Sequence, residues 1–232
     1  AKSRRTETPL VRRVLGDIGF ALRLVWIGNA LAKRLGLGSI DIDRIGTAFV
    51  GDVQLYGEFQ AARREIIDRF HASMEAIDAV AASSGRPIEI HICAHSLGSV
   101  VAFMGLLEGL RRESRWLPRV RSLLTIGSPI DKFLTLWPEI WESFDAPHAA
   151  PPTGTRITWR NFADLADPVG YELDWARERL TAWGDGVFYS ANAGTAEVFG
   201  RYPIPGLAHL GYWTDDALFA HWFEADVQPR SE

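Results

Sequence analysis

Residues 88–104 read IEIHICAHSLGSVVAFM, an apolar run that turns abruptly at residues 94–98 and then resumes. Apolar and other residues alternate over Ile88–Ala94, which predicts a strand. The apolar stretch Ser99–Leu110 predicts a helix directly after the turn. A strand that feeds a helix through so short a turn is the basic unit of an α/β fold.

The turn holds a serine, Ser96, between two very small residues. Ala94 and Gly98 lie two positions before and after it. Small side chains permit the close approach of strand and helix that a sharp turn demands, and a helix beginning there directs its positive end at the hydroxyl. The stretch therefore predicts a nucleophilic serine, provided that the rest of the chain supplies a base and a group that orients the base.

The remaining pattern extends this unit into one sheet. Strands separated by helical stretches pair in parallel through crossover connections, so the sequence predicts an α/β fold with a parallel sheet covered on both faces. A proline-rich excursion from the core is expected over 135–154. The further predicted elements are an amphipathic helix over Phe59–Ala81 ended by Gly85 and Pro87, strands over Val120–Ile126, Arg156–Phe162 and Ala196–Phe199, and a last helix over Asp215–Glu224.

Composition fits one ordinary globular domain of 232 residues with 47% hydrophobic content. Cys93 is the single cysteine, so no internal disulfide forms, and no metal-ligand spacing is present. We therefore expect neither a metal nor another cofactor. Residues 1–45 carry nine Lys/Arg and four Asp/Glu, a net charge of +5, which leaves −9 on the remainder, and this acidic body argues against nucleic acid as a partner.

The basic N-terminal part is also apolar over residues 14–38, but charged residues interrupt it before it reaches the length of a bilayer span. It could pack as a helix over the core, act as a cap or lid, or lie on a membrane surface. No secretory signal is legible, and the first residue, Ala1, suggests a trimmed N-terminus. We expect a cytoplasmic protein, with peripheral membrane contact through 14–38 left open.

Asp167 is the first candidate for the orienting acid. It follows the predicted strand Arg156–Phe162 in an Asp-Pro turn, where a carboxylate could reach a base held above the sheet. Asp164 is the competing acid. Both could instead be turn and capping residues, as Asp often is beside Pro and Gly.

His209 is the candidate base because it combines an expected loop, rich in Gly and aromatics, with a position late in the chain. His95 adjoins Ser96, and we expect it to line the pocket and contact substrate, or to pack. His221 is expected to be a packed or surface residue of the last helix. The other histidines are His71 in the amphipathic helix, His91 in a strand and His148 in the proline-rich segment.

Four motifs in this order resemble the α/β-hydrolase fold and, within it, the serine lipase/esterase-like group. They are Ala-His-Ser-Leu-Gly-Ser at 94–99, Gly-Ser-Pro at 127–129, Asn-x-x-Asp-x-x-Asp-Pro-Val at 161–169 and His-x-Gly-Tyr-Trp at 209–213. The resemblance covers about residues 59–225. It implies Ser96 as nucleophile, His209 as general base and then acid, Asp167 as the group that fixes the imidazole tautomer, and the backbone N–H of Leu97 as one oxyanion donor.

The chain departs from that pattern upstream of Ser96. The family's second oxyanion donor often comes from an earlier loop carrying His-Gly, and this chain has no His-Gly pair. Only one strand-like stretch, over 47–55, precedes the helix at Phe59. Either the chain is an excised portion or an atypical loop supplies the donor. We divide it into a cap-like segment at 1–45 and a partial catalytic core at 46–232.

The resemblance implies hydrolysis of carboxylic esters, lipid-like ones in particular, through an acyl-enzyme. Two alternatives remain open. The same triad could transfer acyl groups or cleave thioesters, because no motif separates these reactions. The chain could also be a non-catalytic scaffold that keeps the fold. Acyl chain, head group and oligomeric state are left open.

Overall fold

The computed structural model describes residues 55–142, 156–170, 172–181, 188–190, 197–200 and 207–228. Within these ranges the strands form one parallel sheet in the order β1-β2-β3-β4. The strand β5 also pairs with β3, along the last residues of β3, whereas β4 pairs with its first residues. The predicted α/β class with a parallel sheet is confirmed. The strands are β1 (Ile90–His95), β2 (Val120–Ile126), β3 (Ile157–Asp164), β4 (Phe188–Ser190) and β5 (Glu197–Phe199).

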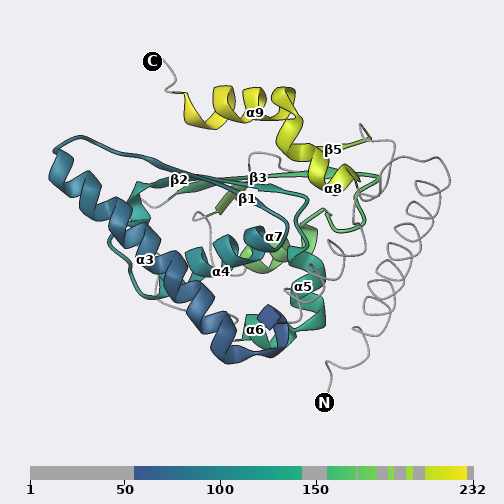
Figure 1. Ribbon diagram of the computed structural model, residues 1–232, viewed down its shortest axis with the longest axis horizontal. Coiled ribbons are helices and arrows are strands. Elements are labelled where there is room, and N and C mark those ends of the chain that lie inside the picture. Colours follow the sequence, from purple (N-terminus) through teal and green to yellow (C-terminus); the bar gives the residue numbers. More distant parts are fainter. Residues whose placement is uncertain are drawn as a thin grey trace, which may run out of the picture.

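Helices cover both faces of the sheet (Figure 1). One face carries α3 (Gln60–Ser84), α4 (Leu97–Arg111), α5 (Ile130–Leu136), α6 (Pro138–Glu142) and α7 (Asp174–Thr181). The other face carries α9 (Asp216–Trp222). The short helix α8 (Leu207–Gly211) precedes α9. Single 3₁₀-helical turns lie at Leu117–Arg119 and Tyr212–Thr214, and a π-helical turn lies at Phe223–Val227.

The core divides into two apolar clusters, one on each face of the sheet. On the α4 face, Phe103 of α4 is fully buried and stacks on Trp159 of β3 with ring centroids 5.2 Å apart. On the α9 face, Leu124 of β2 packs with Leu218 of α9. Because successive strand residues point to opposite faces, neighbouring β2 residues such as Leu123 and Leu124 enter different clusters.

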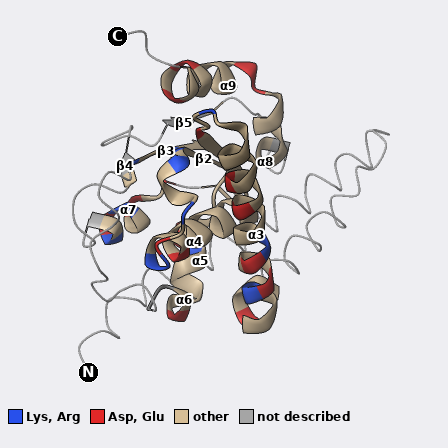
Figure 2. Cartoon of the chain, turned by 90° about the vertical axis from the view of Figure 1, so that its left-hand side faces the viewer, with Lys and Arg blue, Asp and Glu red and all other residues tan. Residues whose placement is uncertain are grey.

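The helix α3 is amphipathic as predicted, and its buried face includes Met74 and Ala81 of the predicted apolar stripe. Basic and acidic residues are interspersed along α3, whereas α9 and the turn after it carry only acidic ones (Figure 2). Phe59 and Ile77, two other apolar residues of the predicted helix, are exposed over 56% and 41% of their surface. Ile67 and His71 are buried. The helix ends at Gly85, whose φ of +63° glycine adopts readily.

The segment expected to leave the core stays in it as far as the structure describes it. Ile140 of α6 is buried, and the Trp137 ring packs on Phe133 with centroids 4.7 Å apart. The prediction of an excursion is therefore wrong for 135–142, because aromatic side chains beside prolines here cover the core. The sequence reading missed β4 and α7, and Leu55, the end of a predicted strand, is helical.

Several predictions concern parts of the chain outside the described residues. These are the cap-like segment at 1–45, the membrane-contacting stretch at 14–38, the strand at 47–54, the rest of the excursion and His148. Within the described ranges, every helix is too short or too polar to cross a lipid bilayer.

Candidate active site

Ser96 lies at the turn between β1 and α4, where the sequence predicted it. Its backbone has φ of +55° and ψ of −132°, a conformation that non-glycine residues rarely adopt. The Ser96 N–H donates to the carbonyl of Ile126 in β2 at 3.1 Å, which fixes the turn to the sheet. Such strain persists only where the surroundings enforce it, and here it lifts the side chain above the carboxyl end of β1.

The structure brings Ser96, His209 and Asp167 together from three distant parts of the chain. The His209 Nε2 lies 2.8 Å from the Ser96 Oγ. On the other side of the ring, His209 Nδ1 lies 3.0 and 3.1 Å from the two carboxylate oxygens of Asp167. Nδ1 bears the hydrogen that an ionised carboxylate accepts, so Nε2 is free of hydrogen and can accept one from the serine. His209 belongs to the helix α8, so the prediction of a loop there is wrong.

The buried Asp167 carboxylate is held by hydrogen bonds to three groups. The backbone N–H of Val169 and the hydroxyl of Tyr212 each donate to the carboxylate at 2.8 Å, and His209 completes the set. Burial alone would raise the pKa of Asp167, but the hydrogen bonds keep that pKa below its usual range. The carboxylate is therefore charged at neutral pH. The competing acid, Asp164, accepts from the N–H of Ala166 at 2.7 Å, as a turn residue does.

Gly127 makes room for this group. Its φ is +55°, and a Cβ built on it would lie 2.8 Å from the Tyr212 ring, 2.9 Å from Asp167 Oδ2 and 3.0 Å from His209 Nδ1. Only glycine fits both the conformation and the space. By contrast, a Cβ on Gly98 would meet no described atom within 4 Å, so among the described residues space is limiting at Gly127 and not at Gly98.

The sequence profile of the alpha/beta hydrolase family matches residues 28–232. The chain belongs to the α/β hydrolase family. No curated protein and no solved structure matches it significantly. The family places a nucleophile at a strand-to-helix turn, which is where this α/β hydrolase holds Ser96.

His95 contacts the histidine that faces Ser96. Its Nε2 donates to the carbonyl oxygen of His209 at 2.6 Å, and the two rings lie 4.5 Å apart. Burial, with a further contribution from His209, lowers the pKa of His95 to about 4, so its ring is neutral at neutral pH. A substrate contact of His95 stays a prediction.

Leu97 is the first residue of α4, so its N–H belongs to a helix turn that lacks intrahelical acceptors. Its role as an oxyanion donor stays a prediction.

The other described histidines of this hydrolase lie away from Ser96. His221 is exposed on α9 with its ring edge toward Phe162, which fits the expected packed or surface residue. His71 is buried among aromatics, and His91 lies 2.8 Å from the Ser122 hydroxyl. Within the described ranges, no three His, Cys, Asp or Glu side chains gather so as to hold a metal ion.

Two hydroxyls that the sequence reading did not single out support the turn at Ser96. The Ser99 Oγ lies 2.5 Å from the carbonyl oxygen of Ser96 and 2.7 Å from the Ser128 Oγ. Both serines are fully buried. They link α4 to the Gly-Ser-Pro turn after β2, and the Ser-x-x-Ser spacing within the 94–99 motif was the signal available in the sequence.

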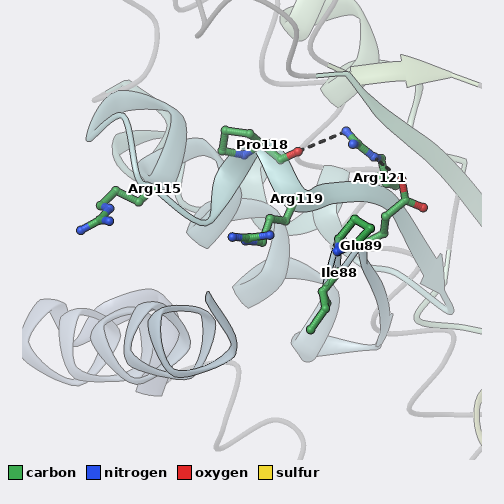
Figure 3. A pocket seen from close by; sticks show the side chains of 7 residues that line it. Ile88, Glu89, Arg115, Pro118, Arg119 and Arg121 are labelled. Carbon is green, nitrogen blue, oxygen red and sulfur yellow. Dashed lines mark hydrogen bonds and ion pairs between the residues drawn. The ribbon is translucent and has the colours of Figure 1, made fainter. Parts of the chain in front are cut away.

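A cavity of about 290 Å³ lies among residues near the start of β1 and β2 (Figure 3). Most of its lining residues precede β1 or β2 and Arg121 is the second residue of β2, whereas Ser96 follows β1, so the cavity and Ser96 lie at opposite ends of β1. Arg119 donates to Asp78 at 2.6 Å and Arg121 donates to Glu89 at 2.9 Å, so these guanidinium groups are engaged in ion pairs. With no nucleophile in its lining, this cavity is not the candidate active site.

Proposed function

We propose that the chain is a serine hydrolase that cleaves carboxylic esters through an acyl-enzyme on Ser96. The observation that carries the proposal is the distance of 2.8 Å between Ser96 Oγ and His209 Nε2, with His209 Nδ1 on the Asp167 carboxylate. A serine hydroxyl is a poor nucleophile unless a neighbouring base takes its proton as it attacks. Membership of the α/β hydrolase family supports hydrolysis as the reaction class.

The geometry allows each proton of the reaction to be followed. As Ser96 Oγ bonds to the ester carbonyl carbon, its proton passes to His209 Nε2, and Asp167 stabilises the imidazolium that results. His209 then gives this proton to the departing alkoxide, which leaves as an alcohol and the acyl group stays on Ser96. A water attacks the acyl-enzyme in the same manner, with His209 again taking and returning a proton, and the carboxylic acid is released.

The negative oxygen of the tetrahedral intermediate needs donors close to Ser96. We assign the backbone N–H of Leu97 as one of them, because the first turn of α4 is adjacent to the hydroxyl and the helix end is positive. One such donor contributes on the order of 100-fold to 1,000-fold in rate.

An apolar, lipid-like acyl group is the substrate that the surroundings favour. Leu165, which precedes Asp167 by two residues, is 79% exposed, and Leu210, next to His209, is 43% exposed. Trp213 is 53% exposed and its ring lies 5.7 Å from that of His95. Large apolar side chains beside a polar reaction centre gain free energy when an acyl chain covers them.

Kinetics on a homologous series of p-nitrophenyl esters test both parts of the proposal. Ser96→Ala and His209→Ala should each lower kcat by at least about 1,000-fold with the far-UV spectrum unchanged. His221→Ala is the matched control, and it should stay within a few-fold of the wild type. If the reverse order is found for the two histidines, the assignment of the base is wrong, and if kcat/KM does not rise with acyl length, the lipid-like substrate is wrong.

Product analysis separates hydrolysis from the other reactions of the same triad. With an added alcohol acceptor, a hydrolase releases mainly free acid, whereas an acyltransferase forms mainly the new ester. A thioester analogue that is cleaved much faster than the matching oxygen ester would favour a thioesterase. An inert wild type, with no activity toward either class, would favour a scaffold.

A further inference from the structure

Lys132, in the first turn of α5, is a buried lysine with 8% of its surface exposed. Lysine is rarely buried unless its ammonium group has partners, because removing a charge from water is costly. Its Nζ donates to the carbonyl oxygen of Pro168 at 2.6 Å. Pro168 directly follows Asp167, so the ammonium group holds the turn that presents the Asp167 carboxylate.

The neighbouring residue Asp131 holds a later part of the same segment. Its two carboxylate oxygens accept from the N–H groups of Trp175 and Ala176, in the first turn of α7, at 2.9 and 3.0 Å. Burial raises the pKa of Asp131 to about 7, against the effect of these two hydrogen bonds. Two adjacent side chains of α5, Lys132 and Asp131, thus fix the backbone after β3 at Pro168 and at the start of α7.

The turn at Pro168 closes tightly around the Asp167 carboxylate. The N–H of Val169, the next residue, donates to Asp167 Oδ1 at 2.8 Å. A Cβ built on Gly170 would lie 2.6 Å from Asp167 Oδ2. A shift of this backbone would therefore move the carboxylate relative to His209 Nδ1, from which it lies 3.0 Å.

We infer that Lys132 is a positioning residue, which holds Asp167 against His209 through the Pro168 carbonyl. The inference rests on the proposed function of the Ser96, His209 and Asp167 group. The contact that carries this role is the hydrogen bond from the Lys132 ammonium group to the backbone of the turn. This role differs from that of a lysine that merely stabilises the fold, and the two roles predict different changes in the pH profile.

Removing the ammonium group should weaken the support that Asp167 gives to the imidazolium. Among the described residues, the charged and titratable groups beside the His209 ring include Asp167 and His95, with Ser96 at Nε2. In Lys132→Met the acidic limb of kcat/KM should move to lower pH, because the protonated ring has lost part of its stabilising partner. The kcat should fall by about 10-fold with KM unchanged, since small displacements of oriented groups reduce turnover.

The experiment compares Lys132→Met with Arg121→Met, which removes an exposed cation at the other end of β2. Arg121→Met should leave the profile unchanged. In an Asp167→Ala background, Lys132→Met should produce no further loss of kcat, because the group that it positions is absent. A lysine with a merely structural role would lower the amount of active protein without moving the limb and would add to the Asp167→Ala loss, and either result would overturn the inference.

Two further measurements keep the inference testable apart from activity. The wild type should show a downfield proton resonance of the His209 Nδ1–H at low pH that Lys132→Met shifts upfield and His209→Gln abolishes. If the wild type turns over no ester but this resonance shifts, the proposed function fails and the positioning role stands. An unchanged resonance in an active wild type and variant overturns the positioning role alone. Should Lys132→Met not fold, Lys132→Gln, which removes the charge and shortens the reach, is compared in the same way.

Discussion

The Tyr212 hydroxyl donates to Asp167 Oδ2 at 2.8 Å and accepts from the backbone N–H of Asp164 at 2.7 Å. Tyr212 is fully buried, and burial together with the charge of Asp167 raises its pKa, so the hydroxyl keeps its proton. One hydroxyl thereby joins the end of β3 to the carboxylate that faces His209. The candidate acid is thus oriented by a side chain that follows the candidate base by three residues.

Tyr212→Phe removes this link while the ring stays in place. We expect kcat to fall by about 10-fold, because Asp167 loses one of its donors and orients His209 less well. The free energy of unfolding should fall by about 1–3 kcal/mol, since the N–H of Asp164 is left buried without this acceptor. Ester kinetics and urea unfolding check the two values, and an unchanged kcat would show that Tyr212 serves stability alone.

Gly127→Ala tests whether the space beside Asp167 and His209 is limiting. An added methyl group would overlap Tyr212 and Asp167, so we expect kcat to fall by about 100-fold, as it does when oriented groups are displaced. Gly98→Ala is the matched control, because its methyl group would enter open space among the described residues. Equal losses in the two variants would contradict this account of Gly127.

His95→Ala separates orientation of His209 from contact with substrate. Because His95 Nε2 binds the His209 carbonyl, we expect a lower kcat with little change in KM. His95→Gln retains an N–H donor, and we expect it to recover part of the loss. A raised KM with kcat unchanged would favour the substrate-binding role expected from the sequence.

His71 makes the stability of the fold sensitive to acid. Burial lowers its pKa below 6.5, with a smaller contribution from Arg112, so the unfolded chain binds a proton at a pH where the folded chain does not. The free energy of unfolding is therefore not reduced by His71 above about pH 6.5. It falls as the pH drops from there toward the pKa of His71 in the folded chain.

We expect Tm to fall less between pH 7 and pH 5 in His71→Phe than in the wild type, because phenylalanine keeps the ring contacts with Phe70 and Trp116 but does not titrate. Other titrating groups, such as Asp131, contribute equally to both proteins. Differential scanning calorimetry at the two pH values gives the comparison. Equal decreases would show that His71 is not the sensitive group.

The parts of the fold that could be predicted from the sequence are those set by neighbours along the chain. The apolar run Val120–Ile126 has the observed bounds of β2, and the turn at Ser96 follows from a strand and a helix that are almost contiguous. The strand β4, with three residues, was missed because its pattern was too brief to show a period, although the equally short β5 lies within a predicted strand.

Contacts between distant parts of the chain could not be predicted from local pattern. Gly127 lies beside Asp167, His209 and Tyr212, with no room for a Cβ. These residues are distant in sequence and meet at the edge where the parallel strands end. Lys132 looks like an ordinary surface lysine in the sequence, and its burial depends on where the turn after β3 lies. The same holds for His71, which is buried on α3 together with Met74 and Ala81 of the predicted apolar stripe.

The central claim is that Ser96 is an activated nucleophile, and labelling with a fluorophosphonate tests it most directly. The reagent should modify the wild type at one equivalent by intact mass, at Ser96 by peptide mapping, and should leave Ser96→Ala unmodified. His209→Ala should label at least about 100-fold more slowly, since the base that activates the hydroxyl is gone. No labelling of the wild type, or equal labelling of Ser96→Ala, would contradict the claim.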